Sequence, residues 1–272
     1  MYNQKNSGKK MKVGIIGGGN LGSSLAKGLL KSSLLMPLEI TLCDKDEQKI
    51  KRLAEFGLNI TTDNRDLVGE NEVVFIAVKP DDVESILEEV RDISEGKLFV
   101  SVAAGVSIKF VEARIRARVI RTMPNICVSV AEMASSFSLG TNATLEDERL
   151  IESMLSGLGA TFKVDEELLE AVTGLSGSGP AFFYQFIKAM RDAGVELGLS
   201  EDIALKLAAQ SAKGAGALVM KSGENIDELT RQVCTPKGTT IEGIKILEDR
   251  KVTDAIKYAV KVATKRAKEL SR

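Results

Sequence analysis

Apolar and polar positions alternate in two different ways along the chain. Up to about Val164, short runs rich in β-branched residues are separated by segments whose apolar residues recur three and four positions apart. The runs predict strands over residues 12–16, 39–43, 72–78, 98–102 and 118–121. The segments 21–30 and 47–56 are predicted to be crossover helices. This alternation predicts an α/β fold built on a doubly wound, mostly parallel sheet.

The second part of the chain has a different pattern. After Asp165 the β-branched runs stop, and Ala, Leu, Gly and Lys recur with helical periodicity. The length of 272 residues also fits two domains. We therefore predict an α/β domain over residues 1–165, with 1–10 as a polar, disordered extension, and an all-helical domain over residues 166–272. No linker rich in proline and glycine separates them, so we expect the domains to pack together.

Histidine is absent from the sequence, and this narrows the chemistry. Ser-His-Asp hydrolysis, histidine-ligated metal centres and histidine-assisted hydride transfer are excluded. The cysteines Cys43, Cys127 and Cys234 are far apart, which indicates a reducing compartment and argues against a zinc site. We therefore expect no metal ion in the site.

The numbers of basic and acidic residues limit the partners that the protein can bind. With 37 basic and 38 acidic side chains, 4% aromatic residues and no tryptophan, the chain has neither the positive field nor the stacking surfaces that nucleic acid requires. No apolar run reaches the roughly 20 residues that a membrane span needs, and the first residues lack the apolar core of a signal peptide. We expect no nucleic-acid partner, no membrane partner and a cytoplasmic location.

A glycine-rich turn carries the first functional signal. The sequence G-G-G-N-L-G, which begins at Gly17, is a G-x-G-x-x-G motif placed directly between a predicted strand and a predicted helix. Gly17 permits the tight turn, Gly19 lets the backbone approach a pyrophosphate, and Gly22 lets helix and strand pack closely. Asn20 and Leu21 begin a helix whose first N–H groups favour an anion. A tight turn without a ligand is the alternative, but the flanking elements are typical of a Rossmann-type dinucleotide-binding domain.

An acidic residue follows the second predicted strand. An acid in the position of Asp44 usually binds the ribose hydroxyls of the cofactor and favours NAD. The ammonium group of the neighbouring Lys45 is suited to the 2′-phosphate of NADP. The sequence therefore predicts a dinucleotide cofactor and leaves NADPH and NADH as alternatives.

Two further turns follow predicted strands, where open α/β sheets bind their ligands. The first turn comprises Ala77, Val78, Lys79 and Pro80, and the second comprises residues 121–125 (RTMPN), with Met123, Pro124 and Asn125 at its end. Lys79 is suited to a phosphate or to the nicotinamide carboxamide, with a solvated lysine at a strand end as the alternative. The second turn is predicted at the rim of the cofactor cleft, with an ordinary turn as the alternative.

Two segments of the helical part are rich in small hydroxyls and glycine. Thr173–Pro180 (TGLSGSGP) precedes a helix predicted over residues 182–197, and Thr235–Thr240 (TPKGTT) precedes one over residues 241–247. Helix N-termini that carry Ser or Thr hydroxyls can hold a carboxylate. Ordinary N-capping is the alternative, but it needs a single hydroxyl. We therefore interpret both segments as helix N-termini that form an anion site.

These motifs together resemble one family. TGLSGSGPA at 173–181, AGVELGL at 193–199 and LTRQV leading into TPKGTTIEG at 229–243 are similar to the pyrroline-5-carboxylate reductases, which complete proline synthesis. The shorter landmarks VKP at 78–80 and SVAAGV at 101–106 occur in the order that this family shows. The resemblance spans nearly the whole chain.

The resemblance implies NAD(P)H-dependent reduction of the cyclic imine L-1-pyrroline-5-carboxylate to L-proline. By the family's pattern, Thr173 is the catalytic residue that hydrogen-bonds the ring nitrogen. Thr235, the backbone of Thr239 and the hydroxyl of Thr240 are then expected to hold the substrate carboxylate. Further contacts to substrate are expected from Met123, Pro124, Ser176 and Gly238, and contacts to the cofactor from Ala103 and Asn125. The resemblance also implies homodimers through interleaved C-terminal helices, assembled into decamers in some members.

Reduction of an imine suits a chain without histidine. The carbon of a C=N bond accepts hydride readily once its nitrogen is protonated, and an imine can take that proton from water before it binds. A ketone is too weakly basic to do so. The protein then needs no strong acid, and most of the acceleration comes from holding the nicotinamide C4 against the imine carbon.

Two alternatives remain on the sequence alone. A dehydrogenase of another Rossmann-plus-helical family, of the 3-hydroxy-acid or prephenate type, would share the first domain. The former needs a catalytic lysine, for which Lys188 on an expected solvated face is the nearest candidate, and the latter needs a histidine. The other alternative is a non-catalytic dinucleotide-sensing protein, which would not need Thr173 and Thr240.

Overall fold

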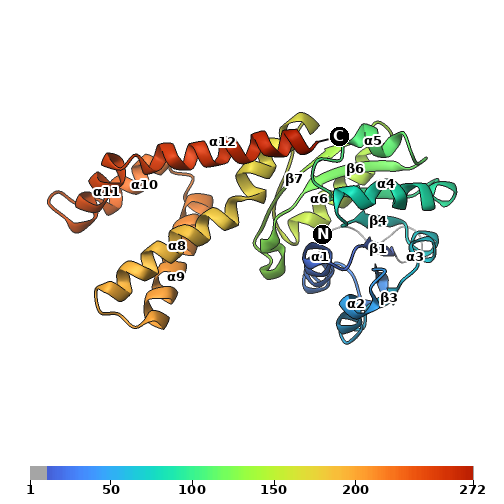
Figure 1. Cartoon of the computed structure of the whole chain (residues 1–272), viewed down its shortest axis with the longest axis horizontal. Coiled ribbons are helices and arrows are strands. Elements are labelled where there is room, and N and C mark those ends of the chain that lie inside the picture. The colour runs from blue at the N-terminus through green and yellow to red at the C-terminus, as the bar shows by residue number, and fades with distance from the viewer. Residues whose placement is uncertain (1–10, 272) are drawn as a thin grey trace. The chain divides into compact units, whose positions relative to one another are not determined.

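The computed structural model describes residues 11–271, which form two compact units (Figure 1). The first unit contains the described residues up to Gly177 and those from Ala263 onward, and the second is Ser178–Val262. The extension predicted over residues 1–10 lies outside the described residues. The two units divide later along the chain than the predicted boundary between residues 165 and 166, because the segment up to Gly177 packs on the sheet.

An eight-stranded sheet forms the centre of the first unit, in the order β3-β2-β1-β4-β5-β6-β7-β8. The strands are β1 (Val13–Ile16), β2 (Ile40–Cys43), β3 (Asn59–Thr61), β4 (Val73–Ile76), β5 (Leu98–Ser101), β6 (Arg118–Met123), β7 (Met133–Leu139) and β8 (Gly159–Lys163). Each neighbouring pair is parallel except β6 with β7. The prediction of a mostly parallel sheet is confirmed.

Helices cover both faces of this sheet, because successive residues of a strand point to opposite sides. In β4, Val73 and Phe75 belong to one buried apolar cluster, and Val74 and Ile76 belong to the other. The helices that contribute to the first cluster are α1 (Asn20–Lys31), α2 (Glu47–Ala54) and α6 (Leu145–Ser156). Those that contribute to the second are α3 (Asn64–Glu70), α4 (Pro80–Glu89) and α5 (Ile108–Glu112). The sheet is therefore doubly wound, as predicted.

The sequence pattern does not predict three of these strands, β3, β7 and β8. β3 has only three residues and is partly exposed, so it lacks a buried β-branched run. β7 has the sequence MASSFSL, whose serines the pattern does not distinguish from a loop. They are buried because their hydroxyls have partners: Ser138 Oγ donates to the carbonyl oxygen of Val164 at 2.7 Å, and Ser135 Oγ lies 3.0 Å from Thr161 Oγ1 on β8.

The second unit is all-helical, as predicted. Its helices are α8 (Gly179–Glu196), α9 (Glu201–Ser222), α10 (Ile226–Val233), α11 (Thr239–Asp249) and the first part of α12 (Val252–Leu270). α8 and α9 lie side by side (Figure 1), and they approach closely where Gly194 faces Ala204. No helix within residues 11–271 is long and apolar enough to cross a membrane.

The central position of Phe75 predicts a large contribution to stability. Its side chain is fully buried in β4, so replacement by alanine leaves a cavity between the sheet and its helices. We expect Phe75→Ala to lower the free energy of unfolding by about 3–5 kcal/mol, measured by urea denaturation at fixed protein concentration. Phe56→Ala is the matched control, because Phe56 is half exposed, and it should cost less than about 1 kcal/mol. Equal losses would contradict this assignment of the core.

Candidate active site

The glycine-rich turn joins β1 to α1 in the geometry that the motif predicts. Gly17 has a φ of +110°, and a Cβ on it would strike the carbonyl oxygen of Ala77, which directly follows the neighbouring strand β4. A Cβ on Gly22 would strike the carbonyl oxygen of Gly17, so glycine allows α1 to start against β1. At Gly19, by contrast, no described atom lies within 4 Å of the Cβ position. Gly17 and Gly22 are therefore packed against backbone atoms, whereas the space beside Gly19 is open.

The N-terminus of α1 is available to an anion. Gly19 occupies the N-cap position, and among the described residues no side chain caps the helix. Its first turn, which begins with Asn20 and Leu21, carries no acidic residue in this description. The first N–H groups of a helix have no partner within the helix, and they carry the positive end of its dipole. The open space at Gly19 thus lies beside a positive helix end, which favours a phosphate.

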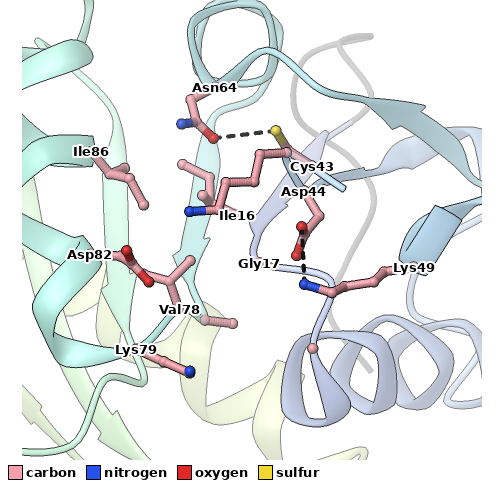
Figure 2. Close-up of a pocket in the computed structure, with 13 residues that line it drawn as sticks. Ile16, Gly17, Cys43, Asp44, Lys49, Asn64, Val78, Lys79, Asp82 and Ile86 are labelled. Atoms are coloured by element: carbon pink, nitrogen blue, oxygen red, sulfur yellow. Dashed lines mark hydrogen bonds and ion pairs between the residues drawn. The ribbon is translucent and has the colours of Figure 1, made fainter. Parts of the chain in front are cut away.

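Asp44 follows β2 and is bonded to the backbone on both sides. Its Oδ2 accepts a hydrogen bond from the backbone N–H of Gly18 at 2.8 Å, and its Oδ1 accepts one from the N–H of Asp46 at 2.9 Å. The ammonium group of Lys49 lies 3.8 Å from Oδ1 (Figure 2). Asp44 therefore fixes the glycine-rich turn against the end of β2.

A cavity of about 290 Å³ lies in front of this turn. Figure 2 shows Lys79 and Asp82 on one side of it and Asp44 and Lys49 on the other. The predicted cofactor residues that line the cavity are Gly17, Gly19, Asp44, Lys45, Ala77, Val78 and Lys79. Pro80 is the first residue of α4, directly behind Lys79, which occupies the N-cap position. Three lysines and two aspartates thus surround a space at the carboxyl ends of β1, β2 and β4.

Several lining residues are missed by the sequence reasoning. They are Ile16, Cys43, Lys49, Asn64, Asp82 and Ile86. Asn64 begins α3, close behind β3, so the rule that ligands lie beyond strand ends would have found it if this short strand had been predicted. Lys49 lies on the first turn of α2, five residues after Asp44, where the spacing of charges alone does not distinguish a cavity from a solvated face.

A second group of predicted residues lies beyond β6. Met123 and Pro124 are buried, and Asn125 joins them to a later segment: its Nδ2 donates to the carbonyl oxygen of Ser176 at 3.0 Å. Asn125 Oδ1 accepts the backbone N–H of Cys127 at 3.2 Å and caps a short 3-10 helix (Ile126–Val130). The side chain of Asn125 therefore holds the end of β6 against the segment that carries Thr173 and Ser176.

Thr173 lies in a π-helical turn, and this corrects the prediction for its segment. We interpret residues 173–180 above as a helix N-terminus, but α7 (Leu169–Val172) runs directly into the π-helical turn Thr173–Gly177 and then into α8. The hydroxyls bond backwards instead of capping: Thr173 Oγ1 donates to Leu169 O at 2.8 Å and Ser176 Oγ to Val172 O at 3.1 Å. Small residues permit this widened turn, a form that is frequent at functional sites.

Ala103, the remaining predicted cofactor residue of the first unit, is 3% exposed. It follows β5 and packs in the buried apolar cluster to which Val74 and Ile76 belong. In the structure Ala103 is therefore a packing residue at the end of a strand, and its contact with the cofactor stays a prediction.

The second hydroxyl-rich segment is a helix N-terminus, as predicted. Gly238 occupies the N-cap position of α11, and its N–H donates to the carbonyl oxygen of Thr235 at 2.9 Å. No side chain of the described residues caps this helix, so the alternative of ordinary N-capping does not apply. Thr239 and Thr240 form the first turn, with Thr240 half-buried. Three hydroxyls thus surround an uncapped helix start in the second unit.

These features define a class of protein. The first unit is a Rossmann-type dinucleotide-binding domain, and an all-helical unit with a hydroxyl-rich helix start follows it along the chain. This combination is typical of two-domain oxidoreductases.

Comparison with known proteins identifies the family. Residues 166–270 match the family model described as pyrroline-5-carboxylate reductase dimerisation, and residues 12–105 match NADP oxidoreductase coenzyme F420-dependent. Pyrroline-5-carboxylate reductase of Methanosarcina acetivorans is 40% identical over 97% of this chain and 99% of its own. The Arabidopsis thaliana enzyme is 39% identical over 97% of both chains. The chain therefore belongs to the pyrroline-5-carboxylate reductase family.

Solved structures agree with this assignment. A pyrroline-5-carboxylate reductase from Coxiella burnetii matches with a TM-score of 0.89 at 30% identity, covering 97% of this chain and all of that one. Plasmodium falciparum pyrroline carboxylate reductase with NADP bound matches with a TM-score of 0.87 at 26% identity, over 97% and 99% of the two chains. The family resemblance inferred from the sequence is confirmed, and dehydrogenases of other Rossmann-plus-helical families are no longer alternatives.

Cys43 at the base of the cavity provides a test of this geometry. Burial and the charges of Asp44 and other nearby acids raise the pKa of its thiol to about 12. Because the thiolate is the reactive form, about one molecule in ten thousand carries it at pH 8. We expect Cys43 to remain unmodified by a thiol reagent at pH 8 in the folded protein and to react after denaturation, measured by mass spectrometry of the labelled peptides. The half-buried Cys234 is the internal control, and labelling of Cys43 as fast as Cys234 would contradict the arrangement.

Proposed function

We propose that this chain catalyses the NAD(P)H-dependent reduction of L-1-pyrroline-5-carboxylate to L-proline. The observation that carries the proposal is its full-length identity of about 40% with pyrroline-5-carboxylate reductases. The turn at Gly17–Gly22 and the cavity in front of it support the cofactor requirement. A bound NAD(P)H supplies the hydride in this reaction.

The cofactor is assigned to the first unit. Gly19 leaves room for the pyrophosphate, and the start of α1 stabilises its charge. Lys45 and Lys79, which both line the cavity, supply positive charge to it. The full set that we assign to the cofactor is Gly17, Gly19, Asn20, Leu21, Gly22, Asp44, Lys45, Ala77, Val78, Lys79, Pro80, Ala103 and Asn125.

Thr173 is assigned to the nitrogen of the substrate ring. Its hydroxyl proton is already donated to Leu169 O at 2.8 Å, so the hydroxyl oxygen serves best as an acceptor. An acceptor matches the N–H of a protonated imine, which is the form that takes up hydride. The hydrogen bond to Leu169 O therefore favours binding of the protonated imine, and Thr173 itself does not have to ionise. This agrees with a chain that has no histidine.

The substrate carboxylate is assigned to the start of α11. The uncapped N–H groups and the hydroxyls of Thr235 and Thr240 favour an anion there, and hydrogen bonds to charged groups contribute about 1.5–3 kcal/mol each. Thr239 would offer a backbone N–H group, and Gly238, whose N–H donates to Thr235 O, would be a close backbone contact at the N-cap position. Remaining contacts are assigned to Met123, Pro124 and Ser176, which Asn125 holds together in the first unit.

The helical part is assigned to dimer formation. Residues 166–270 match the dimerisation model of the family. Within Ser178–Val262 the buried apolar side chains are only Ala204, Ala208 and Leu229, whereas many large ones are exposed. Those with the largest exposed fractions include Phe183, Leu197, Met220, Val233 and Tyr258. A unit with so small a core gains most by burying these side chains against a second copy of the chain.

The finer assembly and the location stay proposals. We place the functional boundary between dinucleotide-binding and dimerisation domains at residues 165/166, in agreement with the residues that the dimerisation model matches. Assembly of dimers into a decamer and a cytoplasmic location are expected on the grounds given above.

The decisive test is the activity of the purified protein. Oxidation of NADPH or NADH that depends on added pyrroline-5-carboxylate, with proline as the product, would support the proposal. Binding of either dinucleotide without turnover would overturn it in favour of the dinucleotide-sensing alternative.

Two threonine variants separate orientation of the ring from binding of the carboxylate. Thr173→Val removes the acceptor at the ring nitrogen, so we expect kcat to fall about tenfold or more with unchanged affinity for NADPH. Thr240→Val removes a contact made before the reaction, so we expect KM for the imine to rise with little change in kcat. Steady-state kinetics measures both. Wild-type kinetics for Thr173→Val would contradict the assignment of Thr173 to the nitrogen of the substrate ring.

The charges at the end of β2 predict how the two cofactors are distinguished. If Lys45 binds the 2′-phosphate, Lys45→Ala should weaken NADPH binding about tenfold and change NADH binding less than about twofold. The enhancement of cofactor fluorescence measures both dissociation constants. Lys51→Ala is the matched control, because Lys51 is exposed on α2 and does not line the cavity. An equal loss for both cofactors would contradict this role of Lys45.

A further inference from the structure

A group of charges that is largely buried lies beside β6, outside the residues assigned above. Arg121 is 3% exposed; its Nη2 donates to Glu170 Oε1 at 2.8 Å, and its Nη1 donates to Glu166 Oε1 at 3.2 Å. Glu166 Oε1 also accepts the backbone N–H of Ile108 at 2.7 Å. Burial by itself raises the pKa of Glu170, but the hydrogen bond and charge of Arg121 outweigh it and lower that pKa. Glu170 is therefore ionised at neutral pH.

The C-terminal end of α12 closes on this group within the first unit. Ser271 Oγ lies 3.0 Å from Glu170 Oε1 and also 3.0 Å from the carbonyl oxygen of Ala267 in the last turn of the helix. Next to it, the carbonyl oxygen of Leu270 approaches Gly105 so closely that a Cβ there would lie 2.7 Å away, and Gly105 has a φ of +74°. Two independent contacts thus place the helix end in one position.

The same carboxylate is connected to the turn that carries Thr173. Glu170 lies in α7, three residues before Thr173, and α7 continues into the π-helical turn without a break. Arg121 lies two residues before Met123 on β6. The turn is thus fastened at two points: the ion pair of Arg121 with Glu170 precedes it, and the bond from Asn125 to the carbonyl oxygen of Ser176 lies near its end.

We infer that Arg121, Glu170 and Ser271 are positioning residues for Thr173, with the end of α12 acting as a brace on the carboxylate of Glu170. This inference rests on the proposed function of Thr173. Ser271 contacts one oxygen of a carboxylate that Arg121 also holds, so loss of the hydroxyl removes one of the two side-chain contacts described for that carboxylate. The hydroxyl of Thr173 then spends less time in the orientation that receives the ring N–H.

The mildest test is Ser271→Ala in the full-length protein. It removes one hydroxyl and leaves the buried ion pair intact, so we expect kcat for pyrroline-5-carboxylate to fall about threefold while the dissociation constant of NADPH is unchanged. Ser156→Ala is the matched control, because Ser156 is an exposed serine at the end of α6, and it should retain the wild-type kcat. Thermal unfolding of both variants verifies the fold.

A second variant tests whether the effect passes through Thr173. Glu170→Gln keeps the size of the side chain but removes its charge, and we expect kcat to fall about tenfold. In a Thr173→Val background, Glu170→Gln should lower kcat less than about twofold, because the group it positions is already gone. If Glu170→Gln does not fold, Ser271→Ala is combined with Thr173→Val in the same way.

The outcomes separate the inference from the function on which it rests. A loss of kcat in Ser271→Ala that disappears in the Thr173→Val background supports the brace. Wild-type kcat in Ser271→Ala and in folded Glu170→Gln overturns it, and so does an equal loss with and without Thr173. If Thr173→Val alone has wild-type kinetics, the proposed role of Thr173 fails first, and the inference fails with it.

Discussion

In β1, β2, β4, β5 and β6 the chain runs in one direction, so every one of these strands ends at the same edge of the sheet. The residues that follow them come from distant parts of the sequence: Gly17, Asp44, Ala77, Ala103 and Pro124. Parallel pairing alone brings them to one edge. The cavity forms there because glycine removes side chains at the first of these ends, where α1 starts against β1.

The two units differ in how much of their apolar side chains they bury within one chain. The sheet of the first unit has helices on both faces, and its core is complete within one chain. The second unit has three buried apolar side chains and many exposed ones, so its stability depends on what covers them. The chain belongs to a family whose dimerisation model matches residues 166–270. A second copy of the same chain therefore covers these exposed side chains.

The residues that we propose to contact the substrate carry hydroxyl groups in place of stronger acids. The hydroxyls of Thr173 and Ser176 donate hydrogen bonds to carbonyl oxygens of their own helical segment, and these bonds orient the hydroxyl oxygens. Neither hydroxyl has to ionise. In the proposed reaction no strong protein acid is needed, because a protonated imine brings its own proton. Carboxylates and guanidinium groups are present nearby, but Arg121 and Glu170 neutralise each other in the interior, where they hold the backbone in place.

The sequence by itself determined the buried parallel strands β1, β2, β4, β5 and β6, the glycine turn and the family, because periodicity and motif are local properties of the chain. It did not reveal β3, β7 and β8, which depend on partners across the sheet for the burial of short or serine-rich segments. It also suggested that residues 173–180 form the N-terminus of the following helix, whereas in the structure α7 leads into the π-helical turn Thr173–Gly177 before α8 begins. Only the tertiary structure brought Lys49 and Asn64 to the cavity and Ser271 to Glu170, because contacts between residues far apart in sequence leave no periodic signal.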